Sequence, residues 1–131
     1  MTIRLRLTLA AEAAALGRAR TALRRWCDEN GIGDERWRRE LLVVASELCT
    51  NAVEAAPASA SVRLHAWTQA DRVWLQVDDD GPGLELRADE VLVPPPHLAR
   101  GRGLLIVRSL TDRVEAGRDG DSTWVRVSRR L

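Results

Sequence analysis

Three short stretches of this sequence carry side chains and glycines whose spacing suits chemistry. Glu47 and Asn51 are four residues apart, so a helix places their side chains on one face. Residues 79–83 read Asp-Asp-Gly-Pro-Gly, and residues 100–104 read Arg-Gly-Arg-Gly-Leu. A carboxylate, an amide oxygen and two glycine-rich turns are components of a nucleotide–magnesium site, provided that the fold brings them together.

The pair Glu47 and Asn51 suits metal-assisted proton transfer. Mg²⁺ typically keeps several waters and takes further ligands from phosphate oxygens, so the side-chain oxygen of Asn51 is a sufficient protein ligand. Glu47, one turn away, would then accept a proton from an attacking water or hydroxyl group. The alternative is a solvated glutamate beside an asparagine on a helix surface.

The acidic turn that begins at Asp79 suits recognition of a purine base. A carboxylate at a strand end can accept a hydrogen bond from the exocyclic amino group of adenine. Gly81 and Gly83 let the backbone approach the base without a Cβ in the way. A plain acidic turn explains the same residues. A calcium loop of the EF-hand type is excluded, because its acids alternate whereas these are consecutive.

The stretch 100–104 suits phosphate binding. Gly101 and Gly103 would present backbone N–H groups and a helix N-terminus to phosphates. Arg100 and Arg102 would add bidentate donors for a terminal phosphate. The alternative is a tight loop that enters a helix.

Composition excludes several classes of nucleotide-binding protein. The chain has 131 residues, a formal net charge of +1 and no lysine. A phosphate loop with Gly-Lys-Ser/Thr and a protein-kinase fold with a strand lysine both require that residue. No Gly-x-Gly-x-x-Gly follows the first predicted strand, which excludes a dinucleotide-binding fingerprint. The small net charge gives no reason to expect direct binding to nucleic acid or to a membrane.

The rest of the sequence must form the elements that position these stretches. Apolar and polar residues alternate from Ile3 to Leu9, which predicts a strand. Asp34 has the character of an N-cap for a helix that stops before Pro57. The core stripe predicted for that helix is Leu41, Ala45, Leu48 and Ala52. Other predicted elements are a helix over 10–30, strands over 59–68 and 72–78, a lid or long loop over 84–99, a helix over 104–111, and strands over 113–116 and 123–127.

This order of elements predicts one domain, residues 1–131, of the α+β class. We expect a two-layer sandwich, in which helices cover one face of a mixed, mostly antiparallel sheet. Cys49 is expected to be a small buried hydrophobe. The tryptophans are expected to supply the large apolar side chains, with Trp37 in the core or exposed as an anchor for a partner. No membrane-spanning run or signal peptide is evident, so a cytoplasmic location is expected.

Taken together, the three stretches resemble the N, G1 and G2 boxes of the GHKL (Bergerat-fold) ATPase superfamily, in its histidine-kinase-like domains. The resemblance is strongest to the small ATP-binding domains of anti-sigma-factor serine/threonine kinases. Residues 44–53 match the N box, 77–83 the G1 box and 100–104 the G2 box, while residues 120–127 resemble the final strand. The resemblance spans nearly the whole chain.

The resemblance implies a role for each candidate residue. Asn51 would hold Mg²⁺, Glu47 would be the general base, and Asp79 would read the adenine of ATP. Arg100 or Arg102 would neutralise phosphate charge. The pocket and lid would be formed with Gly81, Gly83, Gly101, Gly103 and Leu104, and with Thr123 on the adenine side.

The resemblance also implies a bacterial regulator of transcription. Such a protein would phosphorylate a serine or threonine of an antagonist protein, and a sigma factor and this antagonist would compete for it in a partner switch. A homodimer is expected. Ala55 stands where related proteins often have histidine, and the lid is short. These departures favour the alternative, a catalytically silent module that binds nucleotide or a partner only.

Overall fold

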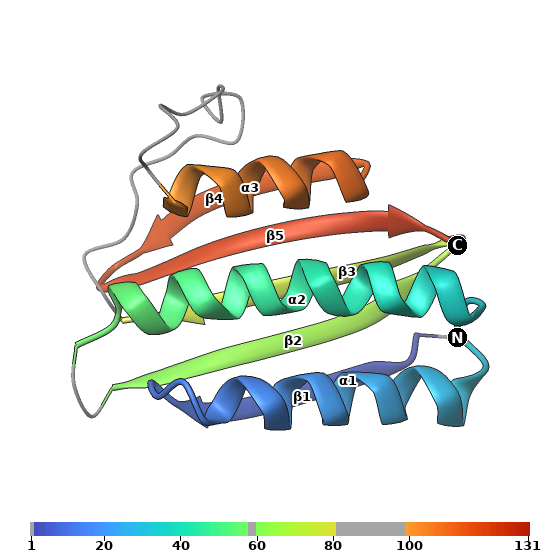
Figure 1. Ribbon diagram of the computed structural model, residues 1–131, viewed down its shortest axis with the longest axis horizontal. Helices are drawn as coiled ribbons and strands as arrows, with labels where there is room; N and C mark the ends of the chain where they lie inside the picture. Colours follow the sequence, from blue (N-terminus) through green and yellow to red (C-terminus); the bar gives the residue numbers. More distant parts are fainter. Residues whose placement is uncertain (1, 58–59, 81–98) are drawn as a thin grey trace.

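The computed structural model describes residues 2–57, 60–80 and 99–131, and for residues 99–102 the backbone alone. These residues form two layers, a twisted sheet and helices on one of its faces (Figure 1). The strand order in the sheet is β1-β2-β3-β5-β4. The elements are β1 (Arg4–Ala10), α1 (Ala15–Asn30), α2 (Glu35–Ala55), β2 (Ser61–Gln69), β3 (Arg72–Asp79), α3 (Ala99–Leu110), β4 (Arg113–Asp119) and β5 (Ser122–Arg130).

The predicted two-layer α+β fold is confirmed, and every pairing among the described strands is antiparallel. The reason lies in the chain path, because each element runs opposite to the one before it (Figure 1). Two helices separate β1 from β2, and α3 and β4 separate β3 from β5. Because the number of intervening elements is even, the two strands of each of these pairs run in opposite directions.

Helix α2 lies between α1 and α3 and carries the predicted N box (Figure 1). The carboxylate of Asp34 accepts a hydrogen bond from the backbone N–H of Trp37 at 2.8 Å, which confirms the predicted N-cap. The buried residues of α2 include the whole predicted core stripe and two more, Val44 and Cys49. Glu47 and Asn51 flank this stripe and are half-buried, as their angular position on the helix predicted.

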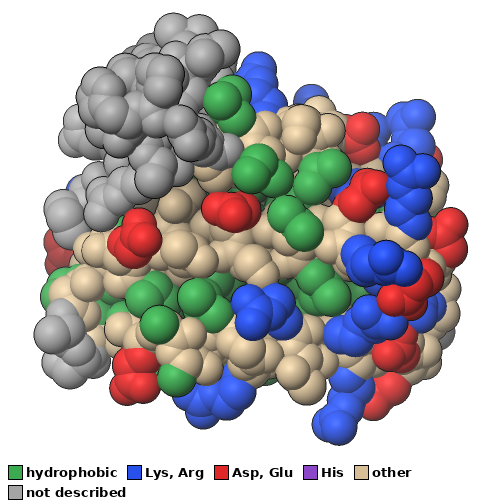
Figure 2. Space-filling view, in the orientation of Figure 1, with side chains coloured by type: hydrophobic (Ala, Val, Ile, Leu, Met, Phe, Trp, Pro, Cys, Tyr) green, Lys and Arg blue, Asp and Glu red, His purple; other side chains and the backbone are tan. Residues whose placement is uncertain are grey.

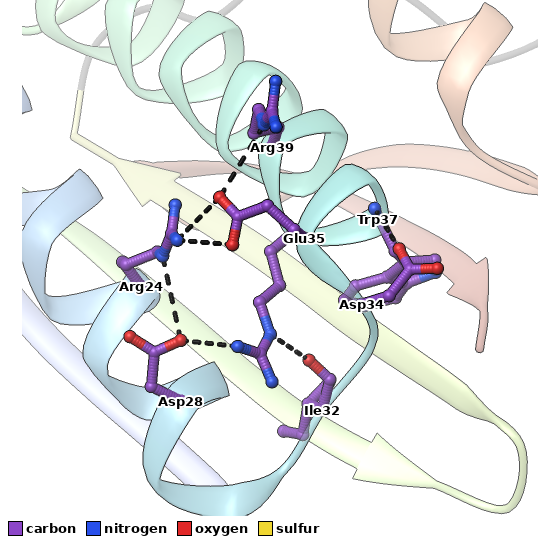
Figure 3. A network of polar contacts seen from close by, with 8 residues as sticks. Arg24, Asp28, Ile32, Asp34, Glu35, Trp37 and Arg39 are labelled. Carbon is purple, nitrogen blue, oxygen red and sulfur yellow. Dashed lines mark hydrogen bonds and ion pairs between the residues drawn. The ribbon is translucent and has the colours of Figure 1, made fainter.

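The turn between α1 and α2 is held by charged side chains (Figure 3). Arg24 donates to both carboxylate oxygens of Glu35, at 2.7 and 2.6 Å. Arg38 donates to the backbone carbonyl of Ile32 at 2.7 Å and to the carboxylate of Asp28 at 2.6 Å. Basic and acidic side chains gather at this end of the helical face (Figure 2). Such exposed pairs contribute little stability singly, but together they fix how α2 leaves α1.

Trp37 joins the start of α2 to the last strand. Its indole N–H donates to the backbone carbonyl of Arg130 at 2.8 Å, and the guanidinium of Arg129 lies over its ring, 5.2 Å from the centroid. Arg129 also pairs with Glu40. Trp37 is half-buried and packs against the hydrophobic core, so the predicted core role describes it better than that of an exposed anchor.

The element boundaries differ from the prediction mainly around the second half of the chain. The last two strands extend well beyond 113–116 and 123–127. Residues at the hairpin turn remain in register, and the far end of β5 continues to pair with β3. The predicted lid, residues 84–99, lies outside the described residues apart from Ala99, which begins α3. In the part of the chain that the structure describes, no helix is long and apolar enough to cross a membrane.

Candidate functional site

Three consecutive acids end the β3 region, and the pleat of the strand turns them in different directions. Side chains alternate between the faces of a strand, and β3 buries positions 73, 75, 77 and 79 under the helices. Asp79 is accordingly only 7% exposed. Asp78 lies on the other face, where it accepts a hydrogen bond from Gln76 at 2.9 Å, and Asp80 is exposed. Asp79 is therefore the one acid of the three that faces the helical layer.

Thr123 is the cross-strand neighbour of Asp79 on β5. It is 6% exposed and lies on the same helix-facing side of the sheet. Residues directly opposite each other in an antiparallel pair have Cβ atoms about 4.5–5.5 Å apart. The neighbour of Asp79 on β2 is the fully buried Val62. A carboxylate and a hydroxyl beside apolar walls suit a flat ligand that offers an amino group.

A cluster of polar side chains on the face of the sheet opposite the helices fixes the end of β3. Arg63 donates to Asp80 at 3.0 Å and to the hydroxyl of Ser122 at 3.0 Å. That hydroxyl donates in turn to the backbone carbonyl of Asp79 at 3.3 Å. The hydrogen bond from Arg63 holds the pKa of Asp80 below its usual range. The sequence analysis missed this cluster. The predicted turn at 69–71 could have revealed it, because that turn sets the register between the two strands beside it and places position 63 near the acids at the end of the second strand.

Glu47 faces the start of α3. The glycine at position 103 comes so close that a Cβ built on it would lie 2.4 Å from Oε2 of Glu47. Side-chain Cβ atoms do not approach other heavy atoms at this distance, so the Glu47 carboxylate can occupy this position only because residue 103 has no side chain. Glu47 and Gly103, from two of the predicted boxes, are thus in direct contact.

Helix α3 begins earlier than predicted. The sequence indicated a start at Leu104, whereas the backbone is helical from Ala99, so the stretch 100–103 forms the first turn of the helix. Alanine and arginine are strong helix formers, and two glycines weaken a helix without excluding it. The first four N–H groups of a helix lack intrahelical acceptors and carry its positive end. Among the described residues, these are the N–H groups of residues 99–101.

The structure brings several predicted site residues to one end of the molecule. The C-terminal half of α2, the end of β3, the start of β5 and the N-terminus of α3 all lie at the left of Figure 1. Leu104 is 7% exposed on α3. Gly81 and Gly83 lie outside the described residues, as do the side chains of Arg100 and Arg102.

The two cysteines do not add a nucleophile to this site. Cys49 lies between Glu47 and Asn51 in the sequence but faces the core, as predicted. Burial raises the pKa of the Cys49 thiol to about 12 and that of Cys27 to about 11. Both side chains are therefore thiols at neutral pH, and the thiolate is the reactive form.

The oxygen atoms that the protein offers at this site suit a metal ion that takes most of its ligands from water and phosphate. Across residues 2–57, 60–80 and 99–131, no group of three or more His, Cys, Asp or Glu side chains is placed to hold a metal ion. Mg²⁺ retains waters, accepts phosphate oxygens and needs only one or two protein oxygens. The half-buried amide of Asn51 fits that requirement.

Comparison with known protein families shows to which family the chain belongs. Residues 9–129 match the family described as histidine kinase-like ATPase domain. The chain belongs to this family. The match to the histidine kinase-like ATPase domain confirms the resemblance seen in the three boxes. Domains of this kind bind ATP, typically with Mg²⁺. No curated protein matches the chain significantly.

Solved structures share the fold of this ATPase domain. A structure of the RsbU and RsbW domains of Rv1364c from Mycobacterium tuberculosis is 23% identical, with a TM-score of 0.70 over 98% of this chain and 32% of that one. The blue-light activated histidine kinase of Erythrobacter litoralis EL346 is 22% identical, with a TM-score of 0.61 over 90% of this chain and 41% of that one. The histidine kinase AdeS of Acinetobacter baumannii is 20% identical, with a TM-score of 0.56 over 72% of this chain and 47% of that one. The chain thus spans less than half of each.

Proposed function

We propose that this ATPase domain is an anti-sigma-factor-type regulator that transfers the γ-phosphoryl group of ATP to a serine or threonine of an antagonist protein. The contact between Glu47 and Gly103 carries the proposal. It sets a carboxylate against the first turn of α3, whose N–H groups suit phosphates. A carboxylate beside a helix end that suits phosphates favours phosphoryl transfer over nucleotide binding alone.

Each residue would have one task in this reaction. Asp79, with Thr123 beside it, would accept a hydrogen bond from the adenine amino group. Asn51 would hold Mg²⁺, which supplies charge neutralisation to the phosphates. The substrate hydroxyl oxygen would form a bond to the γ-phosphorus as the bond to the β-phosphate oxygen breaks, and Glu47 would take the hydroxyl proton. Catalysis of this kind rests mostly on positioning and electrostatics.

A partner switch would follow from the same site. A sigma factor and the antagonist would compete for the domain, and the bound nucleotide would bias the competition by its different affinity for the two complexes. The likeness to a structure that contains an RsbW domain agrees with such a role. Arg100 and Arg102, at the start of α3, are the proposed cationic partners of the terminal phosphate, and a homodimer remains part of the proposal.

The second candidate is a module that binds nucleotide or a partner without phosphoryl transfer. Ala55 favours it, because this last residue of α2 stands where related proteins often have histidine. In that case Glu47 would have no proton to accept. A silent module that binds nucleotide would show the same nucleotide binding and differ only in transfer, whereas a module that binds a partner only would bind no nucleotide.

Calorimetric titration with a non-hydrolysable ATP analogue, with and without Mg²⁺, is the first test. Wild type should bind with Mg²⁺, and Asp79→Ala should lose binding. Asp78→Ala is the matched control, because that acid lies on the opposite face of the sheet. Equal affinity in wild type and Asp79→Ala would refute the assigned adenine contact.

Labelled γ-phosphate then distinguishes the two candidates. Transfer to a serine or threonine of a protein from the same host should disappear in Glu47→Gln, while calorimetry still detects the nucleotide. Unchanged transfer in Glu47→Gln would show that the base is another residue. Binding without any transfer in wild type would establish the silent module.

A further inference from the structure

The face of the sheet that points away from the helices has an ordered set of side chains. Strand register aligns its outward residues in rows across the sheet. The first, here called the tryptophan row, consists of Arg4, Trp67, Trp74, Ser128 and Arg113. The second, here called the histidine row, consists of Arg6, His65, Gln76, Arg126 and Glu115. None of the described helices covers either row (Figure 1).

An aromatic surface lies at the centre of these rows. Trp67 and Trp74 are opposite each other on β2 and β3, with ring centroids 6.0 Å apart and planes 5° from parallel. The ring of His65 lies 4.6 Å from that of Trp67. The sequence analysis expected the tryptophans to supply large apolar side chains, and these two rings are half-buried on the uncovered face. Tryptophan and arginine are the residues that most often dominate binding at protein interfaces.

Hydrogen-bonding capacity is also unused here. Nε1 of Trp74, Nε2 of His65 and Oγ of Ser128 are buried and have no hydrogen-bond partner within the described part of the chain. Buried polar groups are normally paired, and a buried tryptophan N–H usually finds an acceptor. These three atoms lie beneath the side chains of the two rows, and Ser128 is 0% exposed, so the chain itself leaves these buried polar groups unsatisfied.

Positive charge surrounds the aromatic centre. The two rows contain four arginines and one acid, Glu115, which lies 3.7 Å from Arg126. Among the described residues, Arg4, Arg6 and Arg113 form no ion pair, whereas the arginines just beyond the tryptophan row, Arg72 and Arg130, pair with aspartates at 3.4 Å. The excess is local, because the whole chain has a net charge of only +1. Burial and then Arg6 and Arg4 lower the pKa of His65, so it adds no charge at neutral pH.

We propose that the tryptophan and histidine rows form a docking surface for an acidic segment of a partner protein. Carboxylates of the segment would pair with Arg4, Arg6 and Arg113, and its apolar side chains would lie on Trp67 and Trp74. The surface is on the opposite side of the sheet from Asp79 and α2, so partner and nucleotide can bind together. This inference does not depend on phosphoryl transfer.

Two other occupants fit the surface less well. A second copy docked with β1 against β1 would bring Arg4 and Arg6 of both copies together, and like charges in contact disfavour association. Single-stranded nucleic acid binds by stacking bases on free aromatic faces along an extended cationic groove. Here Trp67 and Trp74 stack on each other, which leaves fewer free faces. An acidic polypeptide satisfies both the charge and the apolar area.

A titration of the full ¹⁵N-labelled chain tests the proposal. The probe is a synthetic peptide of glutamate with interspersed leucine, and the readout is the indole N–H resonance of Trp67 and Trp74. Both resonances should shift saturably. Arg4→Glu with Arg6→Glu should weaken binding about tenfold, since two exposed attractive contacts become repulsive. The matched control is Arg18→Glu with Arg25→Glu, which makes the same charge change at exposed positions of α1.

Four outcomes would overturn the proposal. The first is no saturable shift at millimolar peptide. The second is equal weakening in the α1 control, which would place the peptide elsewhere or show a nonspecific charge effect. The third is tighter binding of a thymidine oligonucleotide that displaces the peptide, which would identify a nucleic-acid surface. The fourth is a shift of the indole resonances with protein concentration alone, which would identify self-association. Circular dichroism verifies that each variant is folded.

Discussion

The backbone of Gly103 in α3 lies against the carboxylate of Glu47 in α2, and a Cβ at position 103 would be 2.4 Å from Oε2. The atom in the way is the far end of a flexible side chain, so it can move at little cost. The glycine therefore sets where the Glu47 carboxylate sits more than how stable the domain is.

Gly103→Ala should displace the Glu47 carboxylate while the fold survives. The gain in helix propensity, about 1 kcal/mol, offsets the cost of the displacement, so the unfolding free energy should stay within about 1 kcal/mol of wild type. The side-chain carboxyl ¹³C resonance of Glu47 should shift, and phosphoryl transfer should fall by about 10²–10⁴, as expected for loss of a general base. Gly17→Ala in α1 is the control, because nothing lies within 4 Å of a Cβ at that position. A Glu47 resonance that does not move in Gly103→Ala would contradict the contact.

Gly33→Ala should destabilise the domain more than Gly31→Ala. Both glycines have positive φ, 68° and 61°, so each alanine carries a similar backbone cost of about 1 kcal/mol. A Cβ at position 33 would in addition lie 2.4 Å from the ring of Trp37, which is fixed by its hydrogen bond, whereas position 31 is open. Overpacking of this kind adds about 1–3 kcal/mol. Urea unfolding curves measure the difference, and equal stabilities would mean that the Trp37 ring moves freely.

Glu40 should make stability depend on acid pH. Hydrogen bonds from Arg129 and Arg36 hold the pKa of Glu40 below its usual range. A carboxyl whose folded-state pKa is lowered contributes stability that is fully present above the unfolded value, about 4.3, and is lost as pH falls through the folded value. Glu40→Gln should therefore be less stable than wild type at neutral pH and equal to it in acid. A series of urea titrations at different pH measures this, and a constant offset between Glu40→Gln and wild type would reject the linkage.

Both cysteines should be unreactive in the folded protein. An ordinary cysteine has a pKa of about 8.5 and is partly thiolate near pH 8. Burial raises the pKa of Cys27 to about 11 and that of Cys49 to about 12, so neither forms appreciable thiolate at this pH. A chromogenic disulfide reagent should titrate no thiol in native protein and both in denaturant. Fast labelling of Cys49 in native protein would show that α2 opens next to Glu47 and Asn51.

Much of the fold was readable from local periodicity. Alternation predicted the strands, and the spacing of apolar residues predicted the buried side of α2 together with the flanking positions of Glu47 and Asn51. Asp34 and Pro57 marked the ends of that helix through N-capping and through the limits that proline imposes on its neighbours. These features depend on backbone geometry within a few residues, which is why the sequence alone determined them. The sequence alone also contained the three boxes that indicated the family.

Tertiary structure decided the contacts between distant segments. The end of β3 carries three acids, and only the paired sheet shows that Asp79 faces the helices beside Thr123. The contact between Gly103 and Glu47 depends on how two helices pack, which propensity does not encode. The tryptophan row forms because strand register aligns Trp67 with Trp74, and register is a property of the assembled sheet. Sequence supplied the chemical groups, and packing of the layers determined which of them meet.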